Sequence, residues 1–278
     1  MADEPAAIAG LSRLAQAYAV VLCDVFGVLH DATRVFPAAV DALAAFRAGG
    51  GTVILVSNSA EPGPHLANTL RARGIPDAYD DLVTGADIAR SLLDGPGGGR
   101  VHHIGPPRDR ILFAGLPVTL TPVEAADQIV CTGYPDSDDD LDAVLAIARG
   151  RGQRMLCTNP DTSLTVGATR LRFAGLVAAR YRALGGCVVE TGKPGALIYR
   201  GALERAERAE RARGRPADPA RVLGIGDTVA LDVVGALRRG FGALQIGEVQ
   251  IDEVQIGARQ PPPADAGRRL YRMPALVW

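Results

Sequence analysis

The feature that most constrains this chain is the alternation of short, valine-rich apolar runs with helical patterns. Residues 19–23 and 52–56 form two continuous apolar runs, which are typical of strands buried on both faces of a parallel sheet. A helical pattern follows each run, over 38–48 and 64–73, and glycine ends both helical segments. This β-α-β-α order predicts an α/β fold with a doubly wound parallel sheet. Ligands of such sheets bind at the carboxyl ends of the strands.

The alternation continues through the rest of the chain. We expect further strands over 100–104, 128–132, 154–158, 221–225 and 241–246. We expect further helices over 87–93, 141–148, 195–213 and 232–238. The middle third therefore forms a second α/β unit. A glycine-rich break is expected over 95–99 and a stiff linker over 261–263, and residues 270–278 are apolar enough to dock on the body.

Charge and cysteine content restrict the partners and the compartment. The net charge of −1 gives no basic field for a nucleic acid. The apolar runs are too short to span a membrane, and residues 1–10 lack the pattern of a signal peptide. The four cysteines form no C-x-x-C pair, which makes a zinc site improbable, and Cys23, Cys157 and Cys187 are interpreted as small core residues. Free thiols suit a reducing compartment, so we expect a cytoplasmic protein.

Polar residues that can perform chemistry follow four of the predicted strands. Asp24 and Asp227 each follow an apolar run, and Asp232 comes five residues after Asp227. Ser57 ends the second run, and Lys193 stands between glycine and proline in a turn. Each has an ordinary alternative, because aspartate caps turns and helices, serine is common in loops, and most lysines are solvated. Carboxylates at neighbouring strand ends also suit Mg²⁺, which prefers oxygen ligands.

The order Asp24, Ser57, Lys193, Asp227 resembles the four motifs of the haloacid dehalogenase superfamily, and the resemblance covers nearly the whole chain. The long insert between Ser57 and Lys193 is similar to the α/β C2-type cap of subfamily IIA, the NagD-like and p-nitrophenylphosphatase-like proteins. Residues 81–86 resemble the start of that cap, and residues 157–161 resemble its Asn-Pro-Asp segment. The Asp-Val-Phe-Gly-Val-Leu-His start and the Leu-Val-Trp end resemble a bacterial subgroup of unassigned function, with Phe or Trp two residues after the first aspartate.

The resemblance implies a core domain over 1–84 and 192–278, Rossmann-like in topology, and a cap domain over 85–191. It implies a phosphate-monoester hydrolase that acts through an aspartyl-phosphate, with a small phosphorylated metabolite as substrate and pairing of caps as a possible route to a homodimer. The resemblance implies that Asp24 is the nucleophile and that Ser57 and Lys193 bind the phosphoryl group. It implies that Asn58, Asn159 and Asp161 are further substrate-binding residues. It implies that Mg²⁺ is bound by Asp24, Asp227, Asp232 and the main-chain carbonyl of Phe26.

One residue departs from the pattern of the phosphatases in this superfamily. The residue two after the nucleophile is usually an aspartate that protonates the leaving group, and here it is Phe26. General acid–base groups typically contribute a factor of about 10² to 10⁴ in rate. The resemblance therefore implies a slow phosphatase, or one that favours good leaving groups such as aryl phosphates. His30, Asp31 or a residue of the cap is a candidate for a substitute acid.

Two other functions remain open from the sequence. A non-catalytic protein that binds Mg²⁺ and a phosphorylated metabolite is compatible with Phe26, and so is a 2-haloacid dehalogenase, which needs no metal. The charged segment 204–213 is interpreted as a solvated helix face with i,i+4 ion pairs rather than as an interaction surface. His102 and His103 are adjacent on a predicted strand and so point to opposite faces, which argues against a shared metal ion.

Overall fold

The computed structural model describes residues 5–76, 78–95, 99–137, 139–166, 169–247 and 269–278. The chain forms two compact units, and each is described by itself. The first unit comprises residues 1–57, 67–83 and 199–278, and the second comprises residues 58–66 and 84–198. The predicted glycine break at 95–99 lies partly outside the described residues, and the predicted linker at 261–263 lies wholly outside them.

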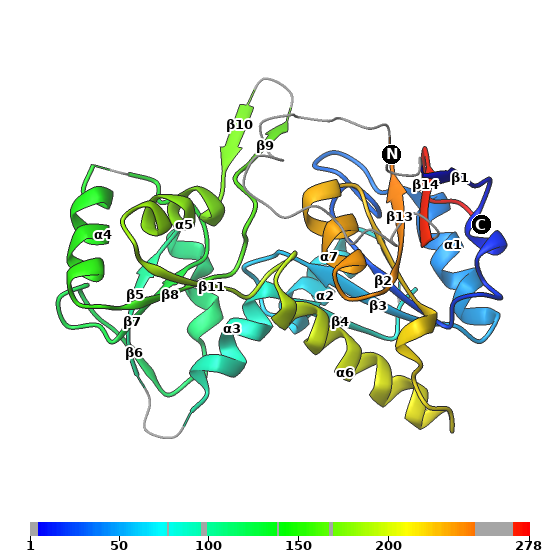
Figure 1. The fold of residues 1–278 in the computed structure, drawn as a ribbon, viewed down its shortest axis with the longest axis horizontal. Coiled ribbons are helices and arrows are strands. Elements are labelled where there is room, and N and C mark those ends of the chain that lie inside the picture. The colour runs from blue at the N-terminus through cyan, green and yellow to red at the C-terminus, as the bar shows by residue number, and fades with distance from the viewer. Residues whose placement is uncertain (1–4, 77, 96–98, 138, 167–168, 248–268) are drawn as a thin grey trace. The chain divides into compact units, whose positions relative to one another are not determined.

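The first unit is built on a seven-stranded sheet in the order β1-β14-β13-β12-β2-β3-β4 (Figure 1). Its strand pairs from β1 to β3 are parallel, and β2, β3, β12 and β13 are wholly buried. The strands are β1 (Ala6–Ala7), β2 (Val20–Cys23), β3 (Thr52–Ser57), β4 (Asp81–Thr84), β12 (Val222–Gly226), β13 (Gly242–Ile246) and β14 (Leu270–Met273). The sheet therefore confirms the predicted doubly wound parallel fold, and the first apolar run lies in its interior between β12 and β3.

Helices connect the strands of the first unit. They are α1 (Pro37–Ala48), α2 (Gly63–Ala72), α6 (Ala196–Ala212) and α7 (Val234–Leu237), with single helical turns at η1 (Leu11–Arg13), η3 (Pro219–Arg221) and η4 (Val229–Val233). Pro37 opens α1 at a position where its missing N–H costs nothing, and Gly49 caps its end. The helix predicted over 232–238 differs from expectation, because its first turn η4 is a π-helix and begins three residues earlier.

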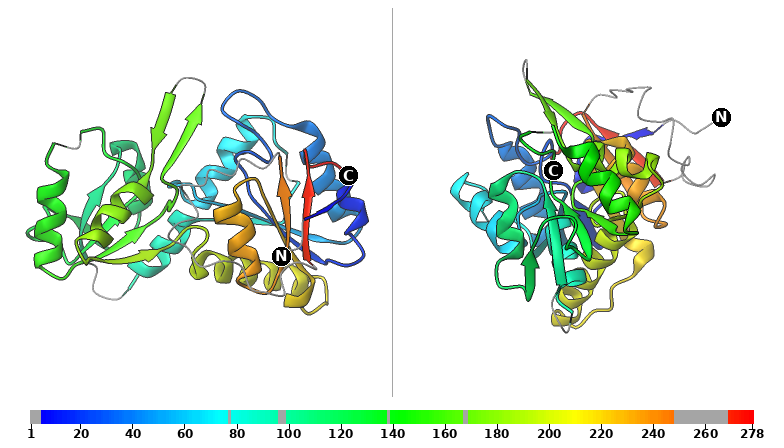
Figure 2. Two further views of the ribbon diagram at one scale, coloured as in Figure 1. Left: turned by 45° about the horizontal axis from the view of Figure 1, so that its top comes forward. Right: turned by 90° about the vertical axis from the view of Figure 1, so that its left-hand side faces the viewer.

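The second unit carries its own parallel sheet, in the order β11-β8-β7-β5-β6. Its elements are α3 (Gly85–Leu93), β5 (Gly99–Ile104), η2 (Pro107–Phe113), β6 (Val118–Leu120), β7 (Gln128–Cys131), α4 (Leu141–Gly150), β8 (Arg154–Cys157), β9 (Ser163–Val166), β10 (Thr169–Arg172), α5 (Ala174–Ala183) and β11 (Cys187–Glu190). β9 and β10 pair as an antiparallel hairpin that projects from the sheet of this unit (Figure 2). The predicted inserted α/β unit is thereby confirmed as a fold.

The charged second half of α6 is exposed at Glu204, Glu207, Arg208 and Arg211, as the sequence predicts, but its ion pairs reach beyond the helix. Arg200 and Glu204 form the expected i,i+4 pair, but Arg205 and Arg208 both approach Asp81 on β4. Beyond the end of the helix, Arg213 bonds the carboxylate of Asp80 at 2.6 Å. The exposed face is therefore confirmed, whereas pairing within the helix is only part of the pattern, because Arg205, Arg208 and Arg213 pair with carboxylates elsewhere in the first unit.

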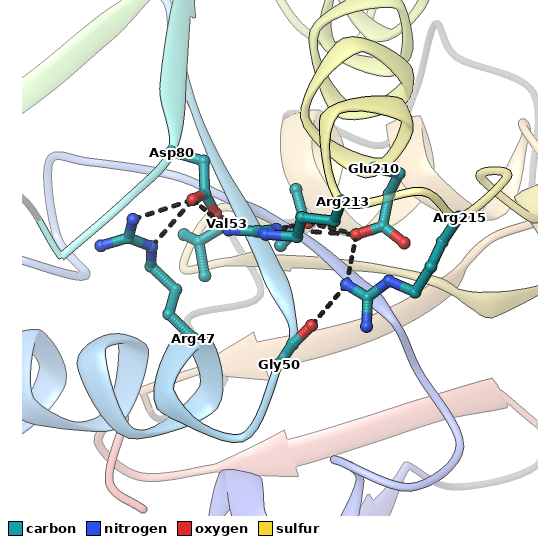
Figure 3. A network of polar contacts seen from close by, with 8 residues as sticks. Arg47, Gly50, Val53, Asp80, Glu210, Arg213 and Arg215 are labelled. Carbon is teal, nitrogen blue, oxygen red and sulfur yellow. Dashed lines mark hydrogen bonds and ion pairs between the residues drawn. The ribbon is translucent and has the colours of Figure 1, made fainter.

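Asp80 anchors one half of this polar network (Figure 3). Its carboxylate accepts hydrogen bonds from the guanidinium of Arg47, from that of Arg213 and from the main-chain N–H of Val53 at 2.8 Å. Burial alone would raise the pKa of Asp80, but these hydrogen bonds and the charges of Arg47 and Arg213 outweigh burial and hold the pKa below its ordinary 3.8. Asp80 therefore stays ionised and ties α1 to the start of β3.

Glu210 anchors the other half, and its side chain is only 3% exposed. It accepts a hydrogen bond from the hydroxyl of Thr52, the first residue of β3, and pairs with Arg215 at 2.8 Å and Arg213 at 3.6 Å (Figure 3). Arg215 also donates to the carbonyl of Gly50. A buried carboxylate is tolerated only when it is paired and hydrogen-bonded, and here the pairing joins α6 to the amino end of β3.

Cys187 departs from the prediction of a core position, whereas Cys23 and Cys157 follow it. Cys23, Cys131 and Cys157 are buried, whereas Cys187 is exposed, so its assignment to the core is wrong. Cys187 opens β11, an edge strand with partly exposed residues, and an apolar neighbourhood in sequence therefore does not place it inside. The expectation that residues 270–278 dock on the body is confirmed, because β14 joins the sheet and Val277 accepts a hydrogen bond from Leu11.

The polar network generates a test of stability. We expect Glu210→Ala to lower the free energy of unfolding by about 2–3 kcal/mol, because it removes the acceptor of the Thr52 hydroxyl and the buried partner of Arg215, whereas Arg213 keeps Asp80. Glu204→Ala is the matched control on the same helix, and its exposed pair predicts a change of no more than about 0.5 kcal/mol. Urea denaturation of both variants measures the difference. Equal losses would show that Glu210 contributes no more than a surface charge.

Candidate active site

Three carboxylates meet at one edge of the sheet of the first unit. Asp24 directly follows β2, Asp227 directly follows β12, and Asp232 lies in the π-turn η4. β2 and β12 are hydrogen-bonded neighbours with Cys23 opposite Ile225, so their carboxyl ends are adjacent. One oxygen from each of the three carboxylates lies within 4.8 Å of the others. The structure thus brings together three residues that the sequence marked separately.

Main-chain hydrogen bonds hold this cluster. The N–H of Asp24 donates to the carbonyl of Ile225 at 2.8 Å, which continues the pairing of β2 and β12 by one residue. The N–H of Thr228 donates to the carboxylate of Asp232 at 3.1 Å, and the N–H of Asp232 donates back to the carbonyl of Thr228 at 2.8 Å. Asp24 and Asp232 are buried, and Asp227 reaches solvent. A π-turn at such a place is a common feature of functional sites.

Two glycines make room for the carboxylates. Gly27 has a φ of +88°, and a Cβ built there would lie 2.0 Å from Oδ2 of Asp227. A Cβ at Gly226 would lie 2.1 Å from the carboxyl carbon of Asp232. Any side chain at either position would displace a carboxylate. These glycines are site residues that sequence reasoning did not single out, although their place directly beside Phe26 and Asp227 was a visible signal.

Phe26 occupies the position where the resemblance expects an acid. Its ring is half-buried and meets the ring of His30 edge to face, with centroids 5.7 Å apart. Nδ1 of His30 lies 2.9 Å from the carbonyl oxygen of Asp31. A carbonyl only accepts, so Nδ1 carries the proton and this contact orients the imidazole. The Asp24-to-Phe26 turn therefore presents an aromatic pair rather than a carboxylic acid.

Asp31 is unsuited to replace the missing acid. The hydroxyl of Thr33 and the main-chain N–H groups of Thr33 and Arg34 all donate to its Oδ1, at 2.7–2.9 Å. These hydrogen bonds, with a smaller contribution from the charge of Arg34, lower the pKa of Asp31 to about 2. Asp31 is therefore an ionised carboxylate near neutral pH and has no proton to give.

Ser57 ends β3, which is the neighbour of β2 on the side away from β12. Leu55 lies opposite Cys23 in the register of these two strands, so Ser57 and Asp24 both belong to the carboxyl edge of the sheet. Ser57 is 9% exposed. Asp227 follows β12, Asp24 follows β2 and Ser57 ends β3, so these two carboxylates and this hydroxyl come from three adjacent parallel strands. The sequence predicted polar residues at the ends of these strands.

Lys193 and Asn58 belong to the second unit, where they are joined. Oδ1 of Asn58 accepts from the main-chain N–H of Lys193 at 2.6 Å, and Nδ2 of Asn58 donates to the carbonyl of Lys193 at 3.2 Å. Lys193 is 3% exposed, and a Cβ at Gly192 would lie 2.5 Å from Oδ1 of Asn58. Asn58 therefore orients the main chain of Lys193, a positioning role that sequence reasoning had not assigned to it.

Asn159 and Asp161 form a tight turn at the carboxyl end of β8. Oδ1 of Asn159 accepts from the N–H of Asp161 at 3.0 Å, and both residues are partly exposed. A Cβ at Gly175 would lie 2.2 Å from the carbonyl oxygen of Pro160, so α5 begins directly against this turn. By contrast, His102 and His103 bond separate partners, Thr121 and Thr132, as their positions on opposite strand faces predicted.

The donor set of the carboxylate cluster fits a hard divalent cation. Three carboxylates within 4.8 Å of one another repel when ionised, and a cation among them relieves that repulsion. Mg²⁺ takes oxygen ligands and is commonly bound through a few carboxylates together with phosphate oxygens. The residues present therefore fit the group that the sequence implied.

A sequence model of the haloacid dehalogenase-like hydrolases matches residues 21–117. A haloacid dehalogenase-like hydrolase from Brucella suis 1330 is 33% identical in sequence, with 97% of this chain and 100% of that chain covered and a TM-score of 0.82. The chain belongs to the haloacid dehalogenase-like hydrolase family.

Two further solved structures share the fold at lower identity. A possible sugar phosphatase from Cytophaga hutchinsonii is 19% identical, with 98% of this chain and 99% of that chain covered and a TM-score of 0.79. A p-nitrophenyl phosphatase from Archaeoglobus fulgidus is 20% identical, with 93% and 96% covered and a TM-score of 0.71. No curated protein matches the sequence. Within the described part of the chain, every helix is too short or too polar to cross a membrane.

The close approach of Gly27 to Asp227 gives a test of the metal site. We expect Gly27→Ala to weaken Mg²⁺ binding by at least about tenfold, because the new methyl group displaces an oxygen of Asp227. Gly74→Ala is the matched control, since Gly74 also has a positive φ but no atom within 4 Å of the added Cβ. Both variants should lose about 1–2 kcal/mol of stability from backbone strain. Equal Mg²⁺ affinities by calorimetry would contradict the assignment.

Proposed function

We propose that this chain is a Mg²⁺-dependent phosphate-monoester hydrolase that acts through an aspartyl-phosphate on a small phosphorylated metabolite. The observation that carries the proposal is the cluster of Asp24, Asp227 and Asp232 at the ends of adjacent strands. A nucleophilic carboxylate beside two metal-binding carboxylates suits an anionic phosphate ester, which needs its charge neutralised before attack. The p-nitrophenyl phosphatase and possible sugar phosphatase of the same fold support this choice.

The chemistry proceeds in two displacements at phosphorus. An oxygen of Asp24 attacks the phosphorus atom, the bond from phosphorus to the leaving oxygen breaks, and that oxygen takes its proton from water. A second water then attacks the phosphorus of the aspartyl-phosphate, which releases phosphate and restores the carboxylate of Asp24. Two such steps replace one difficult displacement by two easier ones. Since Phe26 has no proton to transfer, the first step depends on the leaving group more strongly than in relatives with an acid at that position.

Asp24, Asp227, Asp232 and the main-chain carbonyl of Phe26 would hold the Mg²⁺, which when bound neutralises charge on the phosphate and on the nucleophile. Ser57 donates a hydrogen bond to the phosphoryl group. Lys193 contributes a compact positive charge for the same group, and Asn58 holds the Lys193 main chain in place. Asn58 follows Ser57 directly in the chain, so one short segment carries both the phosphate donor and the support for the lysine.

We propose that residues 85–191 act as the cap, with the core over 1–84 and 192–278. The turn from Asn159 to Asp161 then borders the leaving group of the substrate. The three buried cysteines are free thiols, which suits a cytoplasmic setting.

Phe26 favours a second candidate function, a protein that binds Mg²⁺ and a phosphorylated metabolite without turning it over. The carboxylate of Asp24 weighs against this candidate, because binding alone does not need a nucleophile. The same carboxylate cluster weighs against a 2-haloacid dehalogenase, whose attack on carbon needs no metal. Turnover separates these candidates.

Release of phosphate from p-nitrophenyl phosphate tests the proposal. We expect turnover with Mg²⁺, loss of turnover with EDTA, and loss in Asp24→Asn, which removes the nucleophile while it retains the shape of the side chain. Asp41→Asn is a matched control, because Asp41 lies on the exposed part of α1. Folded protein that binds Mg²⁺ but releases no phosphate from any ester would leave the binding protein as the function.

Because Phe26 stands where an acid is expected, an acid introduced at this position should increase the catalytic activity. We expect Phe26→Asp to raise kcat/KM for an alkyl phosphate such as glycerol 3-phosphate by about 10²-fold, because it supplies a proton to a poor leaving group. For p-nitrophenyl phosphate the gain should be less than about tenfold, since that leaving group departs without protonation. Phe26→Asn is the control that is polar but not acidic. An equal gain with Asn would show that the phenyl ring, rather than the lack of an acid, limits the rate.

A further inference from the structure

The hydroxyl of Tyr199 lies against the main chain that carries Asp232. Tyr199 belongs to α6 and is only 3% exposed, and its hydroxyl donates to the carbonyl oxygens of Leu231 and Asp232, each at 3.2 Å. A tyrosine hydroxyl has one proton, so the two carbonyls share it in a three-centre hydrogen bond. All three residues belong to the first unit, and the contact joins α6 to the π-turn η4.

The two carbonyls lie on either side of the Asp232 Cα. The carbonyl of Leu231 belongs to the peptide unit that precedes Asp232, and the carbonyl of Asp232 belongs to the peptide unit that follows it. Because peptide units are planar, a group that holds both units restrains the φ and ψ of Asp232, and with them the direction of its Cβ. One hydroxyl therefore restrains the start of the Asp232 side chain.

The carboxylate at the other end of this side chain is held separately. The N–H of Thr228 donates to Oδ2 of Asp232 at 3.1 Å. A Cβ at Gly226 would lie 2.1 Å from the carboxyl carbon of Asp232, so this carboxyl group packs directly against the end of β12. The main chain and the carboxylate of Asp232 are thus both fixed, which leaves this member of the carboxylate cluster little freedom to move.

The hydroxyl of Tyr199 is itself held in a fixed position. The Tyr199 ring lies 6.4 Å from the ring of Phe241, with an angle of 60° between the two planes. A Cβ at Gly235, on α7, would lie 2.3 Å from the hydroxyl oxygen of Tyr199. Glycine at this position therefore admits the hydroxyl, and the close packing around the ring prevents it from moving away from η4.

A carboxylate that cannot shift affects which cation the cluster prefers. Mg²⁺ requires near-octahedral geometry with bonds of about 2.0–2.1 Å, whereas Ca²⁺ accepts about six to eight oxygens at roughly 2.3–2.6 Å in variable geometry. Selectivity between the two cations therefore depends on the size and the rigidity of the ligand set. A restrained Asp232 favours the cation with the stricter geometry.

We propose that Tyr199 is a positioning residue for Asp232, and that its hydroxyl makes the carboxylate cluster selective for Mg²⁺ over Ca²⁺. The proposal rests on the proposed function for the place of the cation. Tyr199 acts through the main chain of Asp232 and takes no part in bond breaking. The ordinary alternative is that the hydroxyl only satisfies two main-chain carbonyls and contributes to stability.

Binding of Mg²⁺ and of Ca²⁺ to the full chain, without substrate, tests the proposal. We expect Tyr199→Phe, which keeps the ring and removes the hydroxyl, to raise the dissociation constant for Mg²⁺ by at least about tenfold, as is typical when a group that orients a metal ligand is lost. The dissociation constant for Ca²⁺ should rise by less than about threefold, because Ca²⁺ tolerates a carboxylate that shifts. Calorimetry measures both constants.

Tyr181→Phe is the matched control, because Tyr181 is also buried and donates its hydroxyl to a main-chain carbonyl, that of Gln153 in the second unit. It should lower the melting temperature while it leaves both cation affinities unchanged. If Tyr199→Phe likewise lowers the melting temperature but leaves the ratio of the two dissociation constants unchanged, the ordinary alternative is correct and the proposal is overturned.

Gly235→Ala provides a second variant that acts on the same contact. Its methyl group displaces the Tyr199 hydroxyl, so we expect the same loss of preference for Mg²⁺ in a protein that retains the tyrosine. An unchanged preference in this variant would contradict the proposal.

Asp232→Asn separates this inference from the proposed function. Weaker Mg²⁺ binding by Asp232→Asn, together with an unchanged ratio in Tyr199→Phe, would overturn the role of Tyr199 and leave the proposed metal site intact. Mg²⁺ binding that Asp232→Asn does not weaken would contradict the metal site of the proposed function, and the role of Tyr199 with it.

Discussion

Three carboxylates held within 4.8 Å of one another are the electrostatic constraint on which the proposed site depends. Two unit charges at such a distance repel by about 1 kcal/mol in water and by several times more in a partly buried site. Main-chain pairing of β2 with β12 and the turn around Asp232 hold the cluster against that repulsion. In the proposed function a divalent cation would offset this repulsion, and the same cation would neutralise the charge of a phosphate ester. The proposed metal site and the proposed chemistry therefore both follow from the repulsion among these three carboxylates.

The two ends of β3 show how the sheet separates stability from chemistry. At the amino end, Thr52 is bonded to a buried carboxylate, Glu210, and Val53 is bonded to Asp80. At the carboxyl end, Ser57 lies at the same edge of the sheet as Asp24, the proposed nucleophile. A strand anchored by charge pairs at one end positions a hydroxyl at the other with little freedom. Phe26, by contrast, removes a functional group without disturbing this scaffold, because its ring packs against His30 where a carboxylate would stand. In the proposed mechanism this scaffold supports phosphoryl transfer, and water supplies the proton to the leaving group.

Structural features that depend on local sequence pattern were predicted correctly. Features that depend on contacts between residues far apart in the chain were not. Valine-rich runs followed by Asp24, Ser57 and Asp227 were sufficient to predict the sheet and its functional edge, because parallel strands place their carboxyl ends together. Glu210 was placed on a solvated face, and only the return of the chain to Thr52 shows why it is buried. The hairpin of β9 and β10 was missed because its strands are short and partly polar. The π-turn at Asp232 has no sequence signature, and Cys187 is exposed because its strand lies at an edge.

The proposed mechanism depends on a covalent bond between Asp24 and phosphorus. The most direct measurement is acid quenching of the protein during turnover, borohydride reduction of the acyl phosphate, and mass spectrometry of the peptide that contains residue 24. If Asp24 forms the aspartyl-phosphate, we expect a reduced side chain at Asp24 that depends on both substrate and Mg²⁺. We expect none at Asp31, the next carboxylate along the chain. Phosphate release with no modification at Asp24, or with modification at another carboxylate, would contradict the proposed aspartyl-phosphate at Asp24.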